Sequence, residues 1–287
     1  DAASSQACAR YAASVGVPYV TVGRSELRMR KLRRFFAISM SLDDQGPLLA
    51  DFLVEARRAR QRENAFITYN SSLYDGVHER FLGAMERRGA DVDYVRRLPS
   101  TAGPTEARQV VQEMVLAGVE NVVLVVRPLF LIQVVDQADT QGFDPSWLAS
   151  DDPLTLDTVA KAACTQGPDT FDGARAFSAT PAFHDRDDFD RRYDRAVRAT
   201  DTPQSDSTVW LGWAVGRRIA KMLDIAGRDL TRKRFARRLG DATLKPKIMP
   251  KVRFGTRDNF GARHVHLLRA DCSRDRWVTA RSFASGF

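Results

Sequence analysis

One arginine stands where charge is expensive. Arg127 directly follows the apolar run Val122–Val126, which is typical of a buried strand. A guanidinium at the end of such a strand must be paired with an anion. It fits a carboxylate or other anionic group of a ligand, bound through two parallel hydrogen bonds, or a salt bridge to Asp151 or Asp152. The residue types leave both interpretations open.

Other residue types that carry catalytic chemistry are few. His264 and His266 alternate on a predicted strand and so face one side, but no third metal ligand lies nearby in the sequence. His78 and His184 are expected on the surface. GxSxG, HExxH and phosphate-loop motifs are all missing from the chain. The sequence therefore predicts no catalytic residues, no metal site and no cofactor.

The three cysteines, Cys8, Cys164 and Cys272, form no CxxC pair, so a zinc or redox motif is not indicated. In an oxidising compartment one disulfide and one leftover thiol are expected. Cys164 can pair with Cys272, and a segment ahead of residue 1 can supply a partner for Cys8. Geometry, which the sequence does not give, decides between such pairings.

Alternating strands and helices must position these residues. Val17–Val22 and Ala65–Tyr69 are β-branched apolar runs, and Val77, Phe81 and Met85 then recur at helical spacing. This alternation predicts an α/β fold with a parallel sheet covered on both faces, and ligands beyond the carboxyl ends of the strands. Strands are expected near 66–69, 92–96, 122–126, 147–149 and 174–180. Further along we expect helices at 187–198, 206–226 and 231–239, strands at 251–255 and 262–270, and a hairpin turn at 271–277.

The composition bounds the class of protein. The 287 residues suit two lobes, and no apolar run approaches the length of a transmembrane helix. The net charge is +8, with basic runs at 24–34 and 232–238. Because no aromatic residues are interleaved and the acidic run at 185–190 offsets the field, solvated helix faces are favoured over nucleic-acid or anionic-surface binding.

Five segments together resemble a known family. They are ASSQACARYAASVGVPYV at 3–20, DDQG at 43–46, YNSSLYDGV at 69–77, LVVRP at 124–128 and the GF…WLASDD stretch at 142–152. In these segments, and over nearly all of its length, the chain resembles the extracellular solute-binding proteins of branched-chain amino-acid-type ABC transporters. These are type I periplasmic binding proteins. The resemblance implies two lobes, each a parallel sheet flanked by helices, joined by three crossovers.

The resemblance also implies that neither lobe is continuous. Residues 1–40 and 183–266 are expected in the first lobe, and residues 41–182 and 267–287 in the second. Crossovers are expected near Ala37–Met40, Thr180–Phe183 and Leu267. Family members open with further strand–helix units, so we expect the first lobe to lack part of its sheet. Four apolar residues of that lobe would then be under-covered: Val17, Tyr19, Phe36 and Ile38.

Small hydroxyl residues and backbone amides of the first lobe commonly hold an amino-acid carboxylate in this family. The matching positions are Ser4, Ser5, Gly23 and Ser25. Hydroxyls and free amides at a helix N-terminus stabilise a carboxylate without a buried counter-charge. Simple N-capping of the helix through residue 13 accounts equally well for Ser4 and Ser5.

The second lobe contributes the remaining expected ligand contacts. Tyr74 lies where the family often places an aromatic ring over the ligand, although a surface tyrosine covering a helix start is the alternative. Asp151 matches an acidic residue that holds an ammonium group, but Asp152 and Pro153 replace the usual Gly-rich turn. Arg127 lies where the family often has a ring or a hydroxyl. Arg127 and Asp151 together argue against a simple branched-chain ligand.

The function implied is the extracytoplasmic solute-binding component of an ABC importer. It would bind a small polar ligand, amino-acid-like or carboxylate-bearing, by hinge closure, and would then be recognised by the membrane permease. Nucleic acid is not expected as a partner, and membrane attachment is expected only through a lipid anchor ahead of residue 1. The alternatives are a ligand-sensing regulator of the same fold and an enzyme, which would need a paired acid and base in the cleft.

Overall fold

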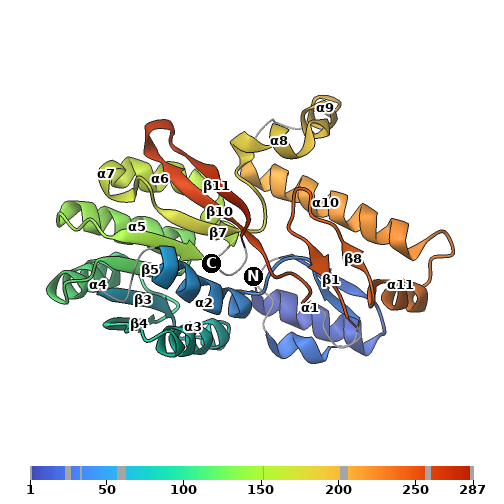
Figure 1. The fold of residues 1–287 in the computed structure, drawn as a ribbon, viewed down its shortest axis with the longest axis horizontal. Helices are drawn as coiled ribbons and strands as arrows, with labels where there is room; N and C mark the ends of the chain where they lie inside the picture. The colour runs from blue at the N-terminus through green and yellow to red at the C-terminus, as the bar shows by residue number, and fades with distance from the viewer. Residues whose placement is uncertain are drawn as a thin grey trace.

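The computed structural model describes residues 2–22, 27–32, 34–56, 63–150, 152–200, 206–255 and 260–284. Two regions lie side by side along the long axis of the molecule (Figure 1). One is built around a seven-stranded sheet, and the other around a two-stranded sheet with a long helix. Both ends of the chain lie near the boundary between them.

The larger sheet has the strand order β11-β10-β7-β6-β5-β3-β4. Strands β4, β3, β5, β6 and β7 are parallel, while β10 runs antiparallel to β7 and β11 antiparallel to β10. The strands span Asn64–Tyr69 (β3), Tyr94–Leu98 (β4), Asn121–Val125 (β5), Ser146–Ser150 (β6), Arg175–Ser178 (β7), Val265–Asp271 (β10) and Arg276–Ala284 (β11). The five strands expected in this part of the chain are confirmed to within two residues at each end, and the hairpin near 271–277 joins β10 to β11.

Helices cover both faces of this sheet. They are α2 (Leu42–Asp51), α3 (Asp75–Arg87), α4 (Pro104–Leu116), α5 (Pro128–Thr140), α6 (Asp157–Gln166) and α7 (Pro168–Phe171). The chain runs outward from β3 to β4 and then returns past β3 to β5, so right-handed crossovers place α3 and α4 on opposite faces. Proline stands at the first position of α4, α5 and α7. It fits a helix start because an N–H group at that position has no partner within the helix, so the lack of one costs no hydrogen bond.

Two glycines explain why the DDQG and YDG segments occur together. A Cβ atom on Gly46 of α2 would lie 2.9 Å from the Val77 carbonyl oxygen and 3.0 Å from the Phe81 nitrogen of α3. A Cβ atom on Gly76 of α3 would collide with the carboxylate of Asp43. At these two glycines α2 and α3 therefore approach each other more closely than any residue with a Cβ atom would permit.

The smaller region contains the parallel pair β1 (Tyr19–Thr21) and β2 (Phe35–Ala37). Around it lie α1 (Ala2–Ser14), η1 (Leu27–Lys31), α8 (Asp187–Asp190), α9 (Arg192–Arg198), α10 (Ser207–Ala226), α11 (Arg232–Leu239), and the antiparallel pair β8 (Thr243–Leu244) and β9 (Val252–Arg253). The helix expected at 187–198 is therefore divided between α8 and α9. Within the described residues, no helix has the length and hydropathy needed to cross a membrane.

The expected exposure of apolar residues beside β1 and β2 is wrong for two of the four positions. Phe36 is 3% exposed and Ile38 is fully buried. Phe36 packs edge-on against Phe254 at 5.2 Å and Phe235 at 6.2 Å between ring centroids. Aromatic side chains from the C-terminal third of the chain thus cover a sheet that has few strands of its own. The other two residues, Val17 and Tyr19, are half-buried.

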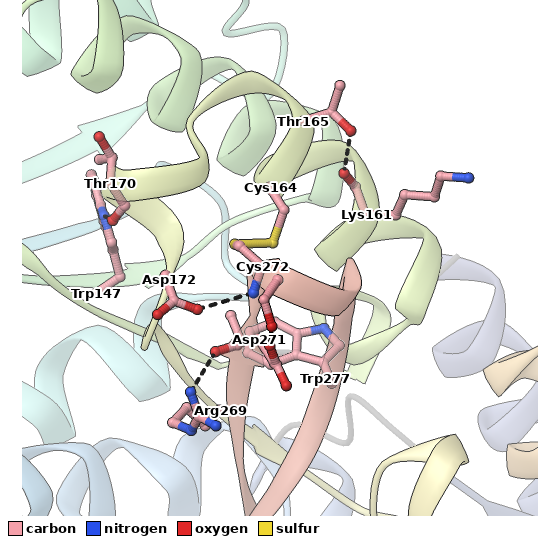
Figure 2. Close-up of a disulfide and its surroundings, with 12 residues drawn as sticks. Trp147, Lys161, Cys164, Thr165, Thr170, Asp172, Arg269, Asp271, Cys272 and Trp277 are labelled. Carbon is pink, nitrogen blue, oxygen red and sulfur yellow. Dashed lines mark hydrogen bonds between the residues drawn. A yellow bond between two sulfur atoms is a disulfide. The ribbon is translucent and has the colours of Figure 1, made fainter.

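A disulfide joins Cys164 of α6 to Cys272, which follows β10, across a sequence separation of 108 (Figure 2). Beside it, the Cys272 amide donates to Asp172 at 3.0 Å. Cys8 is exposed and is a free thiol. The Cys164–Cys272 pairing is therefore the one that forms, and it ties the β10–β11 hairpin to the helical layer.

Candidate ligand-binding site

The carboxyl ends of β3, β5, β6 and β7 lie at one edge of the larger sheet, because these strands are parallel. The chain leaves β7 at this edge toward the smaller region, and the antiparallel β10 enters the sheet from the same edge. The direction of winding reverses between β3 and β5. A switch point of this kind opens a crevice beyond the carboxyl ends of the two strands, which is where α/β folds bind ligands.

Arg127 lies at this switch point. It is the N-cap residue of α5, and its guanidinium carbon lies 5.0 Å from the centre of the Tyr69 ring, at the end of β3. From there Nη2 donates a hydrogen bond to the carbonyl oxygen of Ser100, beyond β4. The side chain thus crosses the ends of β3 and β4. It is exposed and makes no ion pair with a carboxylate among the described residues.

Tyr69 links Arg127 to Tyr74, another expected ligand residue. The Tyr69 and Tyr74 rings pack edge to face with centroids 5.4 Å apart. Tyr74 is the N-cap residue of α3 and is 3% exposed, which rules out a surface tyrosine at this helix start. The structure therefore brings Arg127 and Tyr74 together, with Tyr69 packed between them. In this conformation Arg127 is the exposed member of the three.

Hydroxyl groups lie at the ends of the next two strands. Ser150, the last residue of β6, donates to Oε1 of Gln45 in α2 at 2.5 Å. Ser178, the last residue of β7, lies 3.3 Å from the Thr155 hydroxyl. A cavity of about 10 Å³ adjoins Ser178 and Thr155, which is room for about one water molecule. Apolar side chains such as Phe183 and Trp210 also line this cavity, so little space remains at this end of the edge.

An ion cluster connects the two regions beside this edge. Asp44, in the first turn of α2, binds Arg30 of η1 at 2.6 Å, Arg80 of α3 at 2.9 Å and Arg263 at 3.5 Å. Its Oδ2 atom also accepts a hydrogen bond from the N-cap residue Ser41 at 2.8 Å. Since Arg30 belongs to the smaller region and Arg80 to the larger one, this carboxylate is one of the links between the regions.

Several expected ligand residues cannot be placed. Gly23, Ser25 and Asp151 lie outside the described residues. Ser4 and Ser5 fall in the first half of α1, but their side chains are likewise outside the description.

The histidines do not form a metal site. His266 is fully buried, and its Nε2 lies 2.9 Å from the Ile248 carbonyl oxygen. Burial lowers the pKa of His266 to about 4. Among the described residues no three His, Cys, Asp or Glu side chains come close enough to share a metal ion. His184 is exposed as expected, whereas His78 is half-buried and stacks on Phe66 with centroids 5.6 Å apart.

One acid and base do lie close together. Asp157 Oδ2 is 3.7 Å from His184 Nε2, and burial raises the pKa of the Asp157 carboxyl. However, Oδ1 of Asp157 accepts the Trp277 amide at 3.2 Å, and the Asp157 amide donates to Ser207. These contacts make Asp157 a link between α6, β11 and α10.

Three polar residues at this edge, Tyr69, Ser150 and Gln45, were not found from the sequence. Tyr69 ends the predicted strand Ala65–Tyr69, just as Arg127 follows the predicted strand at 122–126. Tyr69 and Arg127 thus hold equivalent positions in two strand–helix units, and this equivalence could have identified Tyr69 from the sequence. The Ser150–Gln45 contact had no such signal, because it joins residues 105 positions apart.

A mostly parallel seven-stranded sheet flanked by helices, with a second α/β region beside it, is the arrangement of a type I periplasmic-binding-protein fold. The family profile described as periplasmic binding protein matches residues 1–275. The chain therefore belongs to the periplasmic binding protein family, and the resemblance seen in the sequence is confirmed. No curated protein sequence matches the chain.

Solved structures with the same fold are substrate-binding proteins of ABC transporters. A branched chain amino acid ABC transporter protein from Thermus thermophilus with bound valine is 14% identical, with a TM-score of 0.75 over 99% of this chain and 76% of that one. A possible leucine/isoleucine/valine-binding protein from Rhodopirellula baltica is 20% identical, with a TM-score of 0.73 over 96% and 73%. A solute-binding protein from R. palustris in complex with benzoate is 14% identical, with a TM-score of 0.68 over 98% and 75%.

Proposed function

We propose that this protein is the extracytoplasmic solute-binding component of an ABC importer and takes a small ligand that carries a carboxylate. Family membership and fold support solute binding. The ligands named for two structural neighbours, valine and benzoate, differ in size and ring character but share a carboxylate. The proposal assigns binding by hinge closure between two lobes and no covalent step.

The observation that carries the proposal is the placement of Arg127. A guanidinium has five N–H donors. In Arg127 one of them binds the Ser100 carbonyl and the Tyr69 ring packs on the guanidinium, so other N–H donors of this exposed side chain can bind a ligand. A carboxylate can accept two parallel hydrogen bonds from such an edge. The ring and the carbonyl also hold the side chain in place before the ligand arrives, which limits the entropy lost on binding.

The remaining expected contacts are part of the same proposal. Ser4, Ser5, Gly23 and Ser25 would supply hydroxyls and amides from the first lobe. Tyr74 would border the ligand beside Arg127, and Asp151 would receive an ammonium group where the ligand has one. In the sequence, residue 151 directly follows Ser150, the last residue of β6.

Lobe motion is proposed about the three chain crossings. Residues 1–40 with 183–266 form one proposed lobe, and residues 41–182 with 267–287 the other. The Asp44 cluster lies where such a hinge would bend, because Arg30 and Asp44 belong to different proposed lobes. The disulfide supports an oxidising, extracytoplasmic compartment, since such bonds persist there. A membrane permease is the partner that this role requires.

The test is ligand-induced thermal stabilisation of the full chain. Valine, benzoate and other carboxylates would be compared with their matched amides. At a ligand concentration one hundred times Kd, a bound carboxylate should add about 2.7 kcal/mol of stability, and the amide should add much less.

Arg127→Ala should abolish that stabilisation while changing the melting temperature of the empty protein little, because the side chain is exposed. Arg108→Ala, an exposed arginine on α4, is the matched control and should bind normally. If Arg127→Ala melts much earlier yet keeps its affinity, Arg127 is a structural residue. If neither carboxylates nor amides stabilise the protein, the solute class is wrong.

A further inference from the structure

The basic run at 232–238 forms one side of a short amphipathic helix. Phe235 and Leu239 of α11 turn inward: Leu239 is fully buried and Phe235 packs on Phe36. Lys233 and Arg237, one turn apart, project from the opposite side, and Arg238 is exposed on the flank of the helix. We call the exposed residues Arg228, Arg232, Lys233, Arg237 and Arg238 the basic tip.

The cations of the basic tip differ from those elsewhere in the molecule. None of the five has an ion-pair partner among the described residues, whereas their neighbour Arg234 pairs with Asp229 at 2.8 Å. By contrast, near α8 the cations Arg192, Arg217 and Lys247 share the buried Asp190 at 3.0 to 3.7 Å. The acidic run at 185–190 therefore pairs with the cations near α8, whereas the five cations of the basic tip have no such partner among the described residues.

Apolar surface accompanies this charge. Leu230, two residues before α11, is 52% exposed, and Leu223 in the last turn of α10 is 43% exposed. Between the two helices lies an open groove of about 510 Å³, lined by Ile225, Arg237, Arg238, Asp241, Ala242 and Thr243. Two exposed guanidiniums, with the single carboxylate of Asp241, therefore line a groove large enough for a small anionic headgroup.

We propose that the basic tip docks on an anionic phospholipid surface. Clustered cations attract anionic headgroups, and the exposed leucines can enter the boundary between headgroups and acyl chains. Nucleic acid fits less well, because no exposed aromatic side chain is available to stack on bases among the described residues of this surface. This docking does not depend on the identity of the solute.

The position of α11 suits such a role. It lies at the far end of the long axis, on the opposite side of the molecule from the seven-stranded sheet (Figure 1). Contact through this end would leave the carboxyl edge of the larger sheet free to bind solute. The molecule could thus remain close to the membrane while its proposed ligand site stays accessible.

The experiment is co-sedimentation of the full chain with vesicles. Vesicles of phosphatidylcholine mixed with an equal amount of phosphatidylglycerol are compared with pure phosphatidylcholine. We expect binding to the anionic vesicles alone, weakened by added salt. The double variant Arg237→Gln, Arg238→Gln should bind about twenty-five-fold more weakly, since each cation near an anionic surface contributes about fivefold.

The matched control is Arg108→Gln, Lys161→Gln, which removes the same charge from exposed sites on α4 and α6. It should bind the vesicles as the parent does. An equal loss in this control would mean that net charge alone drives binding, and the proposal would fail. Equal binding to pure phosphatidylcholine would also overturn it.

Two further measurements keep the outcome specific. Thermal melts check that the double variant still folds. Its melting temperature should match that of the parent, because both substituted side chains are exposed. Leu230→Ser should weaken vesicle binding without changing retention on a DNA duplex. If the basic tip binds the duplex more tightly than the anionic vesicles, its partner is nucleic acid and the lipid assignment is wrong.

Discussion

In the seven-stranded sheet, backbone groups of the inner strands hydrogen-bond to a strand on each side, whereas in the smaller region β1 pairs with β2 in a sheet of two strands, and side chains satisfy part of the irregular backbone. Arg218 of α10 shows the difference most clearly. It is 7% exposed and donates to the carbonyl oxygens of Lys245, Met249 and Pro250. One guanidinium thus satisfies three carbonyl oxygens of the irregular segment between β8 and β9.

The hydrophobic cores of the two regions also differ in the side chains that fill them. Around β5, valine and leucine side chains fill the space between sheet and helices. Around β2, aromatic rings such as Phe36, Phe254 and Phe260 fill the space, and they come from distant parts of the chain. The larger region also buries large aromatic side chains such as Phe66, Phe81 and Trp277, but it joins them to a regular seven-stranded sheet, which the smaller region lacks. Losing one contact should matter more locally in the smaller region.

The largest effect we expect comes from breaking the covalent link in the larger region. Cys164→Ala with Cys272→Ala removes a cross-link spanning 108 residues and should cost about 4 kcal/mol in unfolding free energy. Hydrogen exchange should then rise in α6 and β11 and stay unchanged in α10. Cys8→Ser, at the exposed free thiol, is the control and should unfold as the parent does. Equal loss of protection in α10 would show that the two regions unfold as one unit.

Arg218→Met is the corresponding break in the smaller region. It leaves buried carbonyls without a donor and should lower the unfolding free energy by about 3 kcal/mol, as measured by urea denaturation. Arg217→Met beside it removes a half-exposed ion pair to Asp190 and should cost less than about 1 kcal/mol. Similar losses in both variants would contradict the role given to the Arg218 hydrogen bonds.

The free energy of unfolding should depend on pH through His266, at the junction of the two regions. His266 lies on β10 between Phe189 and Phe283, and burial lowers its pKa to about 4. Because the folded protein disfavours the protonated ring, the unfolded chain binds the extra proton between about pH 6.5 and pH 4, and stability falls as pH falls. We expect a loss of about 2 kcal/mol on going from pH 7 to pH 5.

The variant His266→Gln isolates this contribution. Glutamine can still donate to the Ile248 carbonyl oxygen but does not titrate. Chemical denaturation at several pH values should give a flatter profile for the variant than for the parent. Identical slopes would assign the pH dependence to other groups.

Sequence periodicity predicts the larger region well because each of its units is local. A strand such as β5 and its following helix are adjacent in the chain, and their apolar patterns are independent of distant partners. The same locality placed Arg127 at a strand end. It could not supply Ser100 or Tyr69 as partners, since those contacts depend on the order of strands in the sheet.

The smaller region was predicted less well for the opposite reason. Phe36 and Ile38 were expected to be under-covered, but Phe254, more than two hundred positions away, covers Phe36. The disulfide likewise required the geometry of two distant segments. Contacts between residues far apart in sequence leave no periodic signal, so the sequence alone could not decide them.

The smallest effects concern glycines in helices of the two regions. Gly46→Ala in α2 places a methyl group about 3 Å from the backbone of α3, and overpacking of this kind costs roughly 1–3 kcal/mol. Alanine recovers about 1 kcal/mol of helix propensity, so we expect a net loss of about 1 kcal/mol. Gly216→Ala in α10 meets nothing within 4 Å and should instead gain about 0.5–1 kcal/mol. Urea denaturation of both variants measures the change in unfolding free energy. A loss for Gly46→Ala with a gain for Gly216→Ala would establish that α2 and α3 are in close contact and that this face of α10 is open. A stabilised Gly46→Ala would mean that α2 and α3 can separate at little cost.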